Sequence, residues 1–148
     1  MKLAHRVQTS ASPAQVWELL GDPGRWPSFN PAVRRVAGAH GRVRTGQTLL
    51  AVGRLTSLRI PIDVVEAVPE RRLELVFFTA PGVSERVVFE LAPRVRGGSV
   101  LRVLVVVEGP LARFAVVPLW LANGLVARIL ATQADRVARA ARRSSGAA

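Results

Sequence analysis

The chain has 148 residues, a formal net charge of +11 and no cysteine. A chain of this length is sufficient for one domain with a sizeable core, and we expect residues 1–148 to form a single domain. The absence of cysteine excludes disulfides, thiolate metal sites and a cysteine nucleophile, and it is typical of a reducing compartment.

The basic residues are almost all arginine, since Lys2 is the only lysine among 21 Lys and Arg residues. An anionic partner, such as nucleic acid or an acidic membrane surface, would explain this excess. A bias in base composition is the favoured explanation, because the arginines are scattered and no aromatic residue lies among their local clusters to stack on a base. We therefore expect weak contact with polyanions or membrane surfaces and no specific nucleic-acid binding.

The chain begins with a pattern typical of one strand followed by two short helices. Residues 2–9 alternate between apolar and polar, which predicts a half-buried strand. Ser12 and Pro13 are good residues for a helix start, so a helix is expected over 13–20. Gly21 and Pro23 end it, and residues 22–29 predict a second short helix.

A run of short strands follows, and their spacing predicts an antiparallel meander. The apolar periodicity places these strands at residues 33–37, 46–55, 58–68, 73–79, 84–92 and 100–108. Thr56-Ser57 is the expected hairpin tip between the second and third of them. Pro61 within the third of them predicts an edge position or a bulge.

The pattern changes at Gly109, and Pro110 can open a helix that continues to about Arg143. Its first half, residues 111–130, is apolar almost all round, so it is either buried all round or faces a ligand, another subunit or lipid. The longest uncharged run, residues 114–127, is shorter than the roughly 20 residues that span a bilayer. The first ten residues lack the apolar core of a signal peptide. We therefore expect a cytoplasmic protein without a transmembrane segment.

This order of elements resembles the helix-grip fold of the START-like superfamily, also called SRPBCC, in its polyketide cyclase/dehydrase and lipid-transport branch. The residues that carry the resemblance are Ser12-Pro13, Val16-Trp17, Asp22, Trp26-Pro27, Val33, Gly46, Val64-Val65-Glu66, Pro69 and Leu73. It implies an α+β fold in which a curved antiparallel sheet of about seven strands wraps around the long C-terminal helix. It also implies a cavity between sheet and helix for apolar ligands such as lipids, polyketides and quinones, and cyclase or dehydratase activity in some members.

The expected ligand-binding residues lie on the inward phase of the strands, on the short second helix and on the long helix. They are Trp26, Phe29, Asn30, Ile60, Ile62, Val64, Leu75, Phe77, Phe89, Val103, Val105, Phe114, Val117, Leu121 and Leu125. The apolar members would equally serve as plain core. Trp26 is either part of the entrance or a packing anchor, and Thr79 joins Asn30 as a polar candidate at the rim. Trp120 is expected to face the pocket, the solvent or a partner.

Three ionisable side chains are candidates for catalysis. Glu66 and Glu85 share the inward phase of their strands, and a buried carboxylate there would have a raised pKa suited to acid–base work. Glu66 would otherwise be exposed and paired with Arg71 or Arg72. His5 lies on the apolar face of its strand and would otherwise be an ordinary core residue. With two histidines and no cysteine, the sequence predicts no metal site and implies no cofactor.

Three functions remain open from the sequence. The first is a binding protein that holds an apolar, lipid-, polyketide- or quinone-like ligand. The second is an aromatase/cyclase or dehydratase that works without a metal. The third is an interaction protein whose apolar C-terminal helix mediates dimerisation or membrane docking. The sequence places few polar side chains on the inward faces of the strands, and this favours the binding protein.

Overall fold

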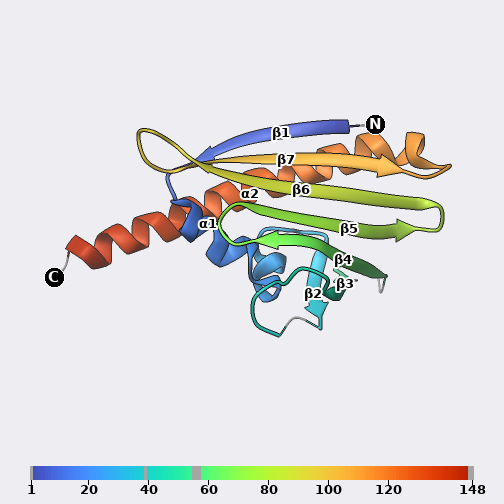
Figure 1. Cartoon of the computed structure of the whole chain (residues 1–148), viewed down its shortest axis with the longest axis horizontal. Coiled ribbons are helices and arrows are strands. Elements are labelled where there is room, and N and C mark those ends of the chain that lie inside the picture. Colours follow the sequence, from blue (N-terminus) through green and yellow to red (C-terminus); the bar gives the residue numbers. More distant parts are fainter. Residues whose placement is uncertain (1, 39, 55–57, 147–148) are drawn as a thin grey trace.

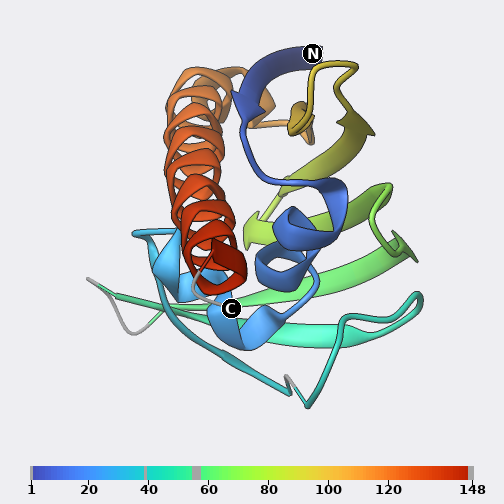
Figure 2. The same cartoon turned by 90° about the vertical axis from the view of Figure 1, so that its left-hand side faces the viewer.

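The computed structural model describes residues 2–38, 40–54 and 58–146. It confirms the predicted α+β helix-grip architecture, in which a curved, seven-stranded antiparallel sheet holds one long helix (Figures 1 and 2). The strands are β1 (Lys2–Thr9), β2 (Val33–Ala37), β3 (Thr48–Gly53), β4 (Arg59–Val68), β5 (Arg72–Ala80), β6 (Val83–Pro93) and β7 (Ser99–Glu108). The expected hairpin tip at Thr56-Ser57 lies outside the described residues.

The sheet order is β1-β7-β6-β5-β4-β3-β2, so the first strand of the chain pairs with the last. Between β1 and β2 lie α1 (Pro13–Leu20) and the short 3-10 helix η1 (Pro23–Ser28). A capping box begins α1, because the Ser12 hydroxyl accepts from the Gln15 amide and the Gln15 side chain accepts from the Ser12 amide. The Asp22 carboxylate then accepts from the Gly24 amide and caps η1.

The helix α2 (Ala112–Gly146) follows β7 and lies along the concave side of the sheet, where Figure 2 shows it closing the open side of the curve. It is a continuous helix through Pro118. Its second half presents a row of small and medium side chains that are at most 2% exposed, namely Ala127, Leu130, Ala134 and Ala138. Small side chains at helical spacing let α2 lie close to the sheet, which is why this half is firmly attached.

Polar contacts fasten the end of β1 to α2. The Asp135 carboxylate accepts hydrogen bonds from the Thr9 hydroxyl at 2.6 Å and from the Ser10 amide at 2.7 Å. Nearby, the fully buried Ser99 hydroxyl donates to the Ala11 carbonyl at 2.7 Å. These bonds satisfy buried polar groups where the chain passes from β1 into α1, and they set the position of α2 along the sheet.

Candidate functional site

A pocket of about 140 Å³ lies between the sheet and the first half of α2. Its walls come from the segment before β2, from β2 to β6 and from one side of the helix. They are formed by Asn30, Ala32, Val33, Ala51, Gly53, Ile60, Phe77, Thr79, Glu85, Leu119, Ala122, Asn123 and Val126. An apolar cavity of about 150 Å³ holds a single benzene ring, whereas pockets for drug-sized ligands span about 300–1,000 Å³. The space therefore fits one ring or a short chain end.

Glu85 is the ionisable side chain in this wall. Its residue is 5% exposed, and burial raises the pKa of the Glu85 carboxyl, while the hydrogen bond from Asn123 partly offsets the rise. The Asn123 amide nitrogen donates both to Glu85 Oε1 and to the Leu119 carbonyl, so it is held in place from two sides. Among the described residues, Asn123 is the hydrogen-bond partner of the Glu85 side chain. The carboxyl oxygens can therefore form further hydrogen bonds with a bound molecule.

Two further polar side chains line the pocket, and sequence reasoning placed both at the rim. Asn30 uses its side-chain oxygen to accept from the Ala32 amide at 3.1 Å, so it shapes the turn that bounds the pocket. Thr79, on β5, contributes the only hydroxyl group among the residues that line this pocket in the described part of the chain. With Glu85 and Asn123 they give an otherwise apolar pocket four side chains able to hydrogen-bond.

The structure divides the expected ligand-binding residues into pocket and core. Asn30, Ile60 and Phe77 line the pocket. The other inward strand residues are at most 5% exposed and fill the core instead, namely Ile62, Val64, Leu75, Phe89, Val103 and Val105. Sheet phase was thus read correctly for these positions, but phase alone does not say which inward side chains border an empty space.

The orientation expected for the helix candidates is wrong. Phe114, Val117, Leu121 and Leu125 are 50–67% exposed and lie on the side of α2 turned away from the sheet. The residues that face the pocket are Leu119, Ala122, Asn123 and Val126, about 100–180° further round the helix. The error has a physical cause, since a segment that is apolar all round carries no periodicity to mark its inward side.

His5 positions the helix and lies outside the pocket lining. Its ring stacks on Trp120 with centroids 5.0 Å apart, and Nε2 lies 2.8 Å from the Trp120 carbonyl oxygen. Because a carbonyl only accepts, Nε2 carries the hydrogen. The ring also lies against Gly124, where an added Cβ would come within 2.7 Å of His5 Cε1. Trp120, 36% exposed, is therefore held on the flank of α2 against β1.

Glu66 points to the outer face of the sheet, so its inward placement is wrong. A β-bulge between Val64 and Glu66 adds one residue, and Glu66 comes opposite Glu74. Its carboxylate lies 3.7 Å from Arg72, the pairing that sequence reasoning gave as the other interpretation. A bulge reverses the phase of every residue beyond it, which period-two reasoning does not anticipate.

Trp26 is a packing anchor. It is 5% exposed, and its indole nitrogen donates to the Leu20 carbonyl at 2.8 Å, which locks η1 onto the end of α1. Phe29 is equally buried in the core. Neither residue lines the pocket, although the segment that follows them, from Asn30 to Val33, does.

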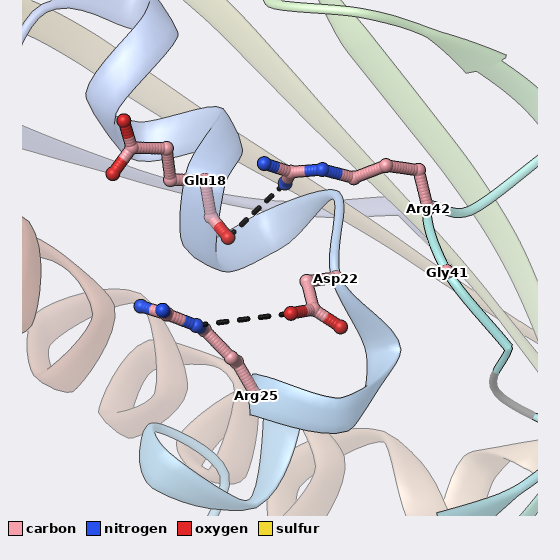
Figure 3. Close-up of a pocket in the computed structure, with 5 residues that line it drawn as sticks. All are labelled: Glu18, Asp22, Arg25, Gly41 and Arg42. Carbon is pink, nitrogen blue, oxygen red and sulfur yellow. Dashed lines mark hydrogen bonds and ion pairs between the residues drawn. The ribbon is translucent and has the colours of Figure 1, made fainter.

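A second depression lies on the surface between α1, η1 and the loop before β3 (Figure 3). It is lined by Glu18, Asp22, Arg25, Gly41 and Arg42 and has a volume of about 280 Å³. Three of its four charged side chains already pair with one another or with the backbone. Asp22 pairs with Arg25 at 3.7 Å, and Arg42 donates to the carbonyls of Trp17 and Glu18. This polar, open hollow offers no enclosed space, so we assign the functional site to the pocket at α2.

Sequence reasoning missed eight residues of the pocket. These are Ala32, Val33, Ala51, Gly53, Leu119, Ala122, Asn123 and Val126. Asn123 carried a usable signal, because it is the one uncharged polar side chain in the apolar segment 111–130. In the described ranges, no group of three His, Asp or Glu side chains is arranged to hold a metal ion.

The fold and pocket define a helix-grip protein with a ligand-sized space between sheet and helix. The chain belongs to the polyketide cyclase / dehydrase and lipid transport family, whose model matches residues 1–142. This membership supports a ligand-binding or cyclase-type role.

Solved structures share the fold at low sequence identity. Protein MLL2253 from Mesorhizobium loti is 17% identical, with a TM-score of 0.75 over 92% of this chain and 98% of that one. CalU16 from Micromonospora echinospora is 16% identical, with a TM-score of 0.63 over 99% and 86%. DynU16, a protein of the dynemicin biosynthetic locus, is 19% identical, with a TM-score of 0.67 over 88% of this chain and 46% of that one. No protein with a curated description matches the chain.

Proposed function

We propose that this protein binds a small apolar molecule, with one oxygen-bearing ring or chain end inserted between the sheet and α2. The observation that carries the proposal is the pocket of about 140 Å³ with Glu85 and Asn123 in its wall. An apolar enclosure favours the ring by removing it from water, and the buried polar pair favours a ligand that satisfies it.

The pocket chemistry narrows the ligand class. A protonated Glu85 donates to a ligand carbonyl, and an ionised Glu85 accepts from a ligand hydroxyl. Quinone- and polyketide-like molecules carry such oxygens on rings, whereas a plain hydrocarbon chain would leave the carboxyl without a new partner. Lipids that would insert a plain hydrocarbon chain are therefore weaker candidates than quinone- or polyketide-like molecules. The rest of a larger ligand would leave the pocket beside Ala32 and Ala122, which are both exposed.

Binding is tested by closing the pocket at an exposed alanine. We would titrate 1-naphthol and 1,4-naphthoquinone by calorimetry and identify any molecule that co-purifies by native mass spectrometry. Ala122→Phe places a ring at the opening without touching the buried core, and we expect it to weaken binding at least tenfold. Ala141→Phe, also an exposed alanine of α2, is the matched control and should bind like the parent protein. Equal binding by both variants contradicts the proposed site.

A second candidate function is acid–base catalysis of the cyclase/dehydratase kind, and the raised pKa of Glu85 favours it. Raising the pKa of a carboxyl brings proton exchange closer to neutral pH, and such a carboxyl can deliver a proton to a leaving hydroxyl or remove one beside a carbonyl. Incubation with a β-hydroxy ketone, followed by mass spectrometry, detects the loss of one water. Glu85→Gln should abolish this loss, because an amide cannot transfer the proton. The naphthol affinity should fall far less, because the Gln amide still donates and accepts hydrogen bonds. Absence of any product with the parent protein leaves binding as the function.

A further inference from the structure

The side of α2 that faces away from the sheet carries an uninterrupted apolar surface. We call it the outer stripe, and it consists of Leu111, Phe114, Val117, Leu121 and Leu125. These side chains are 50–67% exposed, and their spacing along the helix places them on one face. In Figure 2 no described element covers this side of α2. Soluble proteins rarely leave such a contiguous patch without a partner.

The chain segments on both sides of the pocket are basic and free of acidic residues. Between Asp22 and Asp63 there are seven arginines and no Asp or Glu, and between Glu108 and Asp135 there are two arginines and no Asp or Glu. Six of these arginines are exposed near the strands and helix that bound the pocket: Arg34, Arg35, Arg54, Arg59, Arg113 and Arg128. A surface of this kind attracts an anionic partner.

Apart from Glu85 in the pocket wall, the acidic residues lie outside these segments, and several are already neutralised. On the outer face of the sheet, Glu66, Glu74 and Glu90 all pair with Arg72, and Glu74 also pairs with Arg86 at 2.7 Å. The positive charge is therefore unbalanced on the side of α2 and balanced across the sheet. Arg113 additionally lies 4.7 Å from the centre of the Phe114 ring, so one cation borders the outer stripe directly.

The outer stripe also borders the pocket. Ala122 is exposed, lines the pocket and lies next to Leu121 on the helix surface. Arg54, on the other side of the opening, donates to the carbonyl of Val33, another pocket residue, at 3.4 Å. Apolar side chains at the opening with cations around them match the two layers of an anionic bilayer surface, acyl chains beneath charged head groups.

We infer that the outer stripe docks on an anionic phospholipid bilayer and turns the opening of the pocket toward the membrane. Charge complementarity selects this occupant over a second copy of the chain, because two protomers of net charge +11 repel each other. The helix lies in the interface and does not cross it. By length and composition α2 could span a membrane, but its inner face is part of the core at Val116, Val126 and Leu130.

Docking of this kind deepens the proposed function, since an apolar ligand would pass between bilayer and pocket without crossing water. Leu111 lies just before α2, and the helical part of the stripe, from Phe114 to Leu125, is about 17 Å long. That is enough for its side chains to enter the acyl boundary together. Membrane docking itself rests on the stripe and the arginines alone, so it can be tested separately from ligand binding.

Flotation with lipid vesicles tests the inference. We would compare vesicles of phosphatidylcholine with vesicles that contain one third phosphatidylglycerol, at low and at moderate salt. The full chain should bind the anionic vesicles at least tenfold more tightly than the neutral ones, and salt should weaken the binding. The double variant Phe114→Gln/Leu121→Gln should lose at least a further tenfold on anionic vesicles. Phe78→Gln, which alters an aromatic residue 46% exposed on β5, is the matched control and should bind normally.

Three results overturn the inference. Anionic vesicle binding that is insensitive to Phe114→Gln/Leu121→Gln shows attraction by charge alone. Absence of vesicle binding by the parent protein excludes a membrane partner. A dimer in sedimentation that dissociates in the double variant, without vesicle binding, assigns the stripe to a second copy. Ala122→Phe separates this inference from the proposed function, because it should block naphthol binding and leave vesicle binding intact.

Discussion

Replacing Gly124 by alanine tests how α2 is held against β1. The new Cβ would lie 2.7 Å from His5 Cε1 and 3.1 and 3.2 Å from the two ring nitrogens, so the imidazole must move. Its movement disturbs the stack on Trp120 and the 2.8 Å hydrogen bond to the Trp120 carbonyl. Overpacking costs about 1–3 kcal/mol, and a lost hydrogen bond costs about 1 kcal/mol.

Alanine also favours the helix by about 1 kcal/mol relative to glycine, which offsets part of this cost. We expect Gly124→Ala to lower the free energy of unfolding by about 1–2 kcal/mol. That is a fall in Tm of roughly 2–8 °C for a chain of this size, measured by calorimetry or circular dichroism. Gly146→Ala, within α2 at a position where a Cβ meets nothing within 4 Å, should change the Tm little.

A double-mutant cycle decides the cause. In a His5→Ala background the obstacle is gone, so Gly124→Ala should stabilise the protein by up to about 1 kcal/mol. A coupling free energy near zero, or stabilisation by Gly124→Ala in the parent protein, refutes the close packing of His5 against the helix.

Two pH-dependent predictions follow from the buried and hydrogen-bonded carboxyls. The pKa of Glu85 is raised above its ordinary value of 4.5, so folding favours its neutral form, and the parent protein should lose stability as pH rises from 4.5 through the raised value. Glu85→Gln removes this loss, so its Tm relative to the parent should increase from pH 4 to pH 8; a pH-independent difference contradicts burial as the cause. Partial burial alone would raise the pKa of Asp135, but the hydrogen bonds from Thr9 and Ser10 and the charge of Arg139 outweigh it and lower this pKa below 3.8. Its stabilisation is complete above that value and lost as pH falls through the lowered pKa, so Asp135→Asn should flatten acid unfolding below pH 4; parallel acid-unfolding curves contradict the assignment.

The fold was predictable because short sequence patterns indicate where its helices and strands lie. Ser12 and Pro13 start a helix through backbone chemistry that operates within a few residues. The strands alternate because one face of the sheet meets the core and the other meets solvent, as for Leu73 and Leu75, which are at most 2% exposed. These local patterns, together with the order of the elements along the chain, were enough to predict the helix-grip architecture.

The candidate site was only partly predictable because it depends on contacts between distant segments. Glu85 was named from strand phase, but its partner Asn123 lies 38 residues away, and only the docked helix brings them together. Glu66 was misplaced by a bulge that adds one residue at Val65, a position that local propensity does not distinguish. The inward face of α2 could not be read from apolar periodicity where every face is apolar, and the lone polar Asn123 was its one marker.

The two halves of α2 are held by different forces, and this difference bears on ligand entry. The second half packs through Ala127, Leu130 and Ala134, which are fully buried, so its separation would expose core surface to water. The first half buries fewer apolar side chains, chiefly Val116 and Val126, and is also held through His5 on Trp120 and Glu85 with Asn123. The polar groups of these last contacts regain hydrogen bonds in water.

Pro118 lowers the cost of a local movement further, because it has no amide hydrogen to bond the Phe114 carbonyl. A ligand larger than the pocket of about 140 Å³ would therefore be admitted by displacement of the first half of α2, while the second half stays in the core. The outer stripe lies on this same half of α2. If the outer stripe docks on a bilayer as inferred, burial of its apolar side chains there would stabilise a displaced helix, so membrane contact and pocket opening would favour each other.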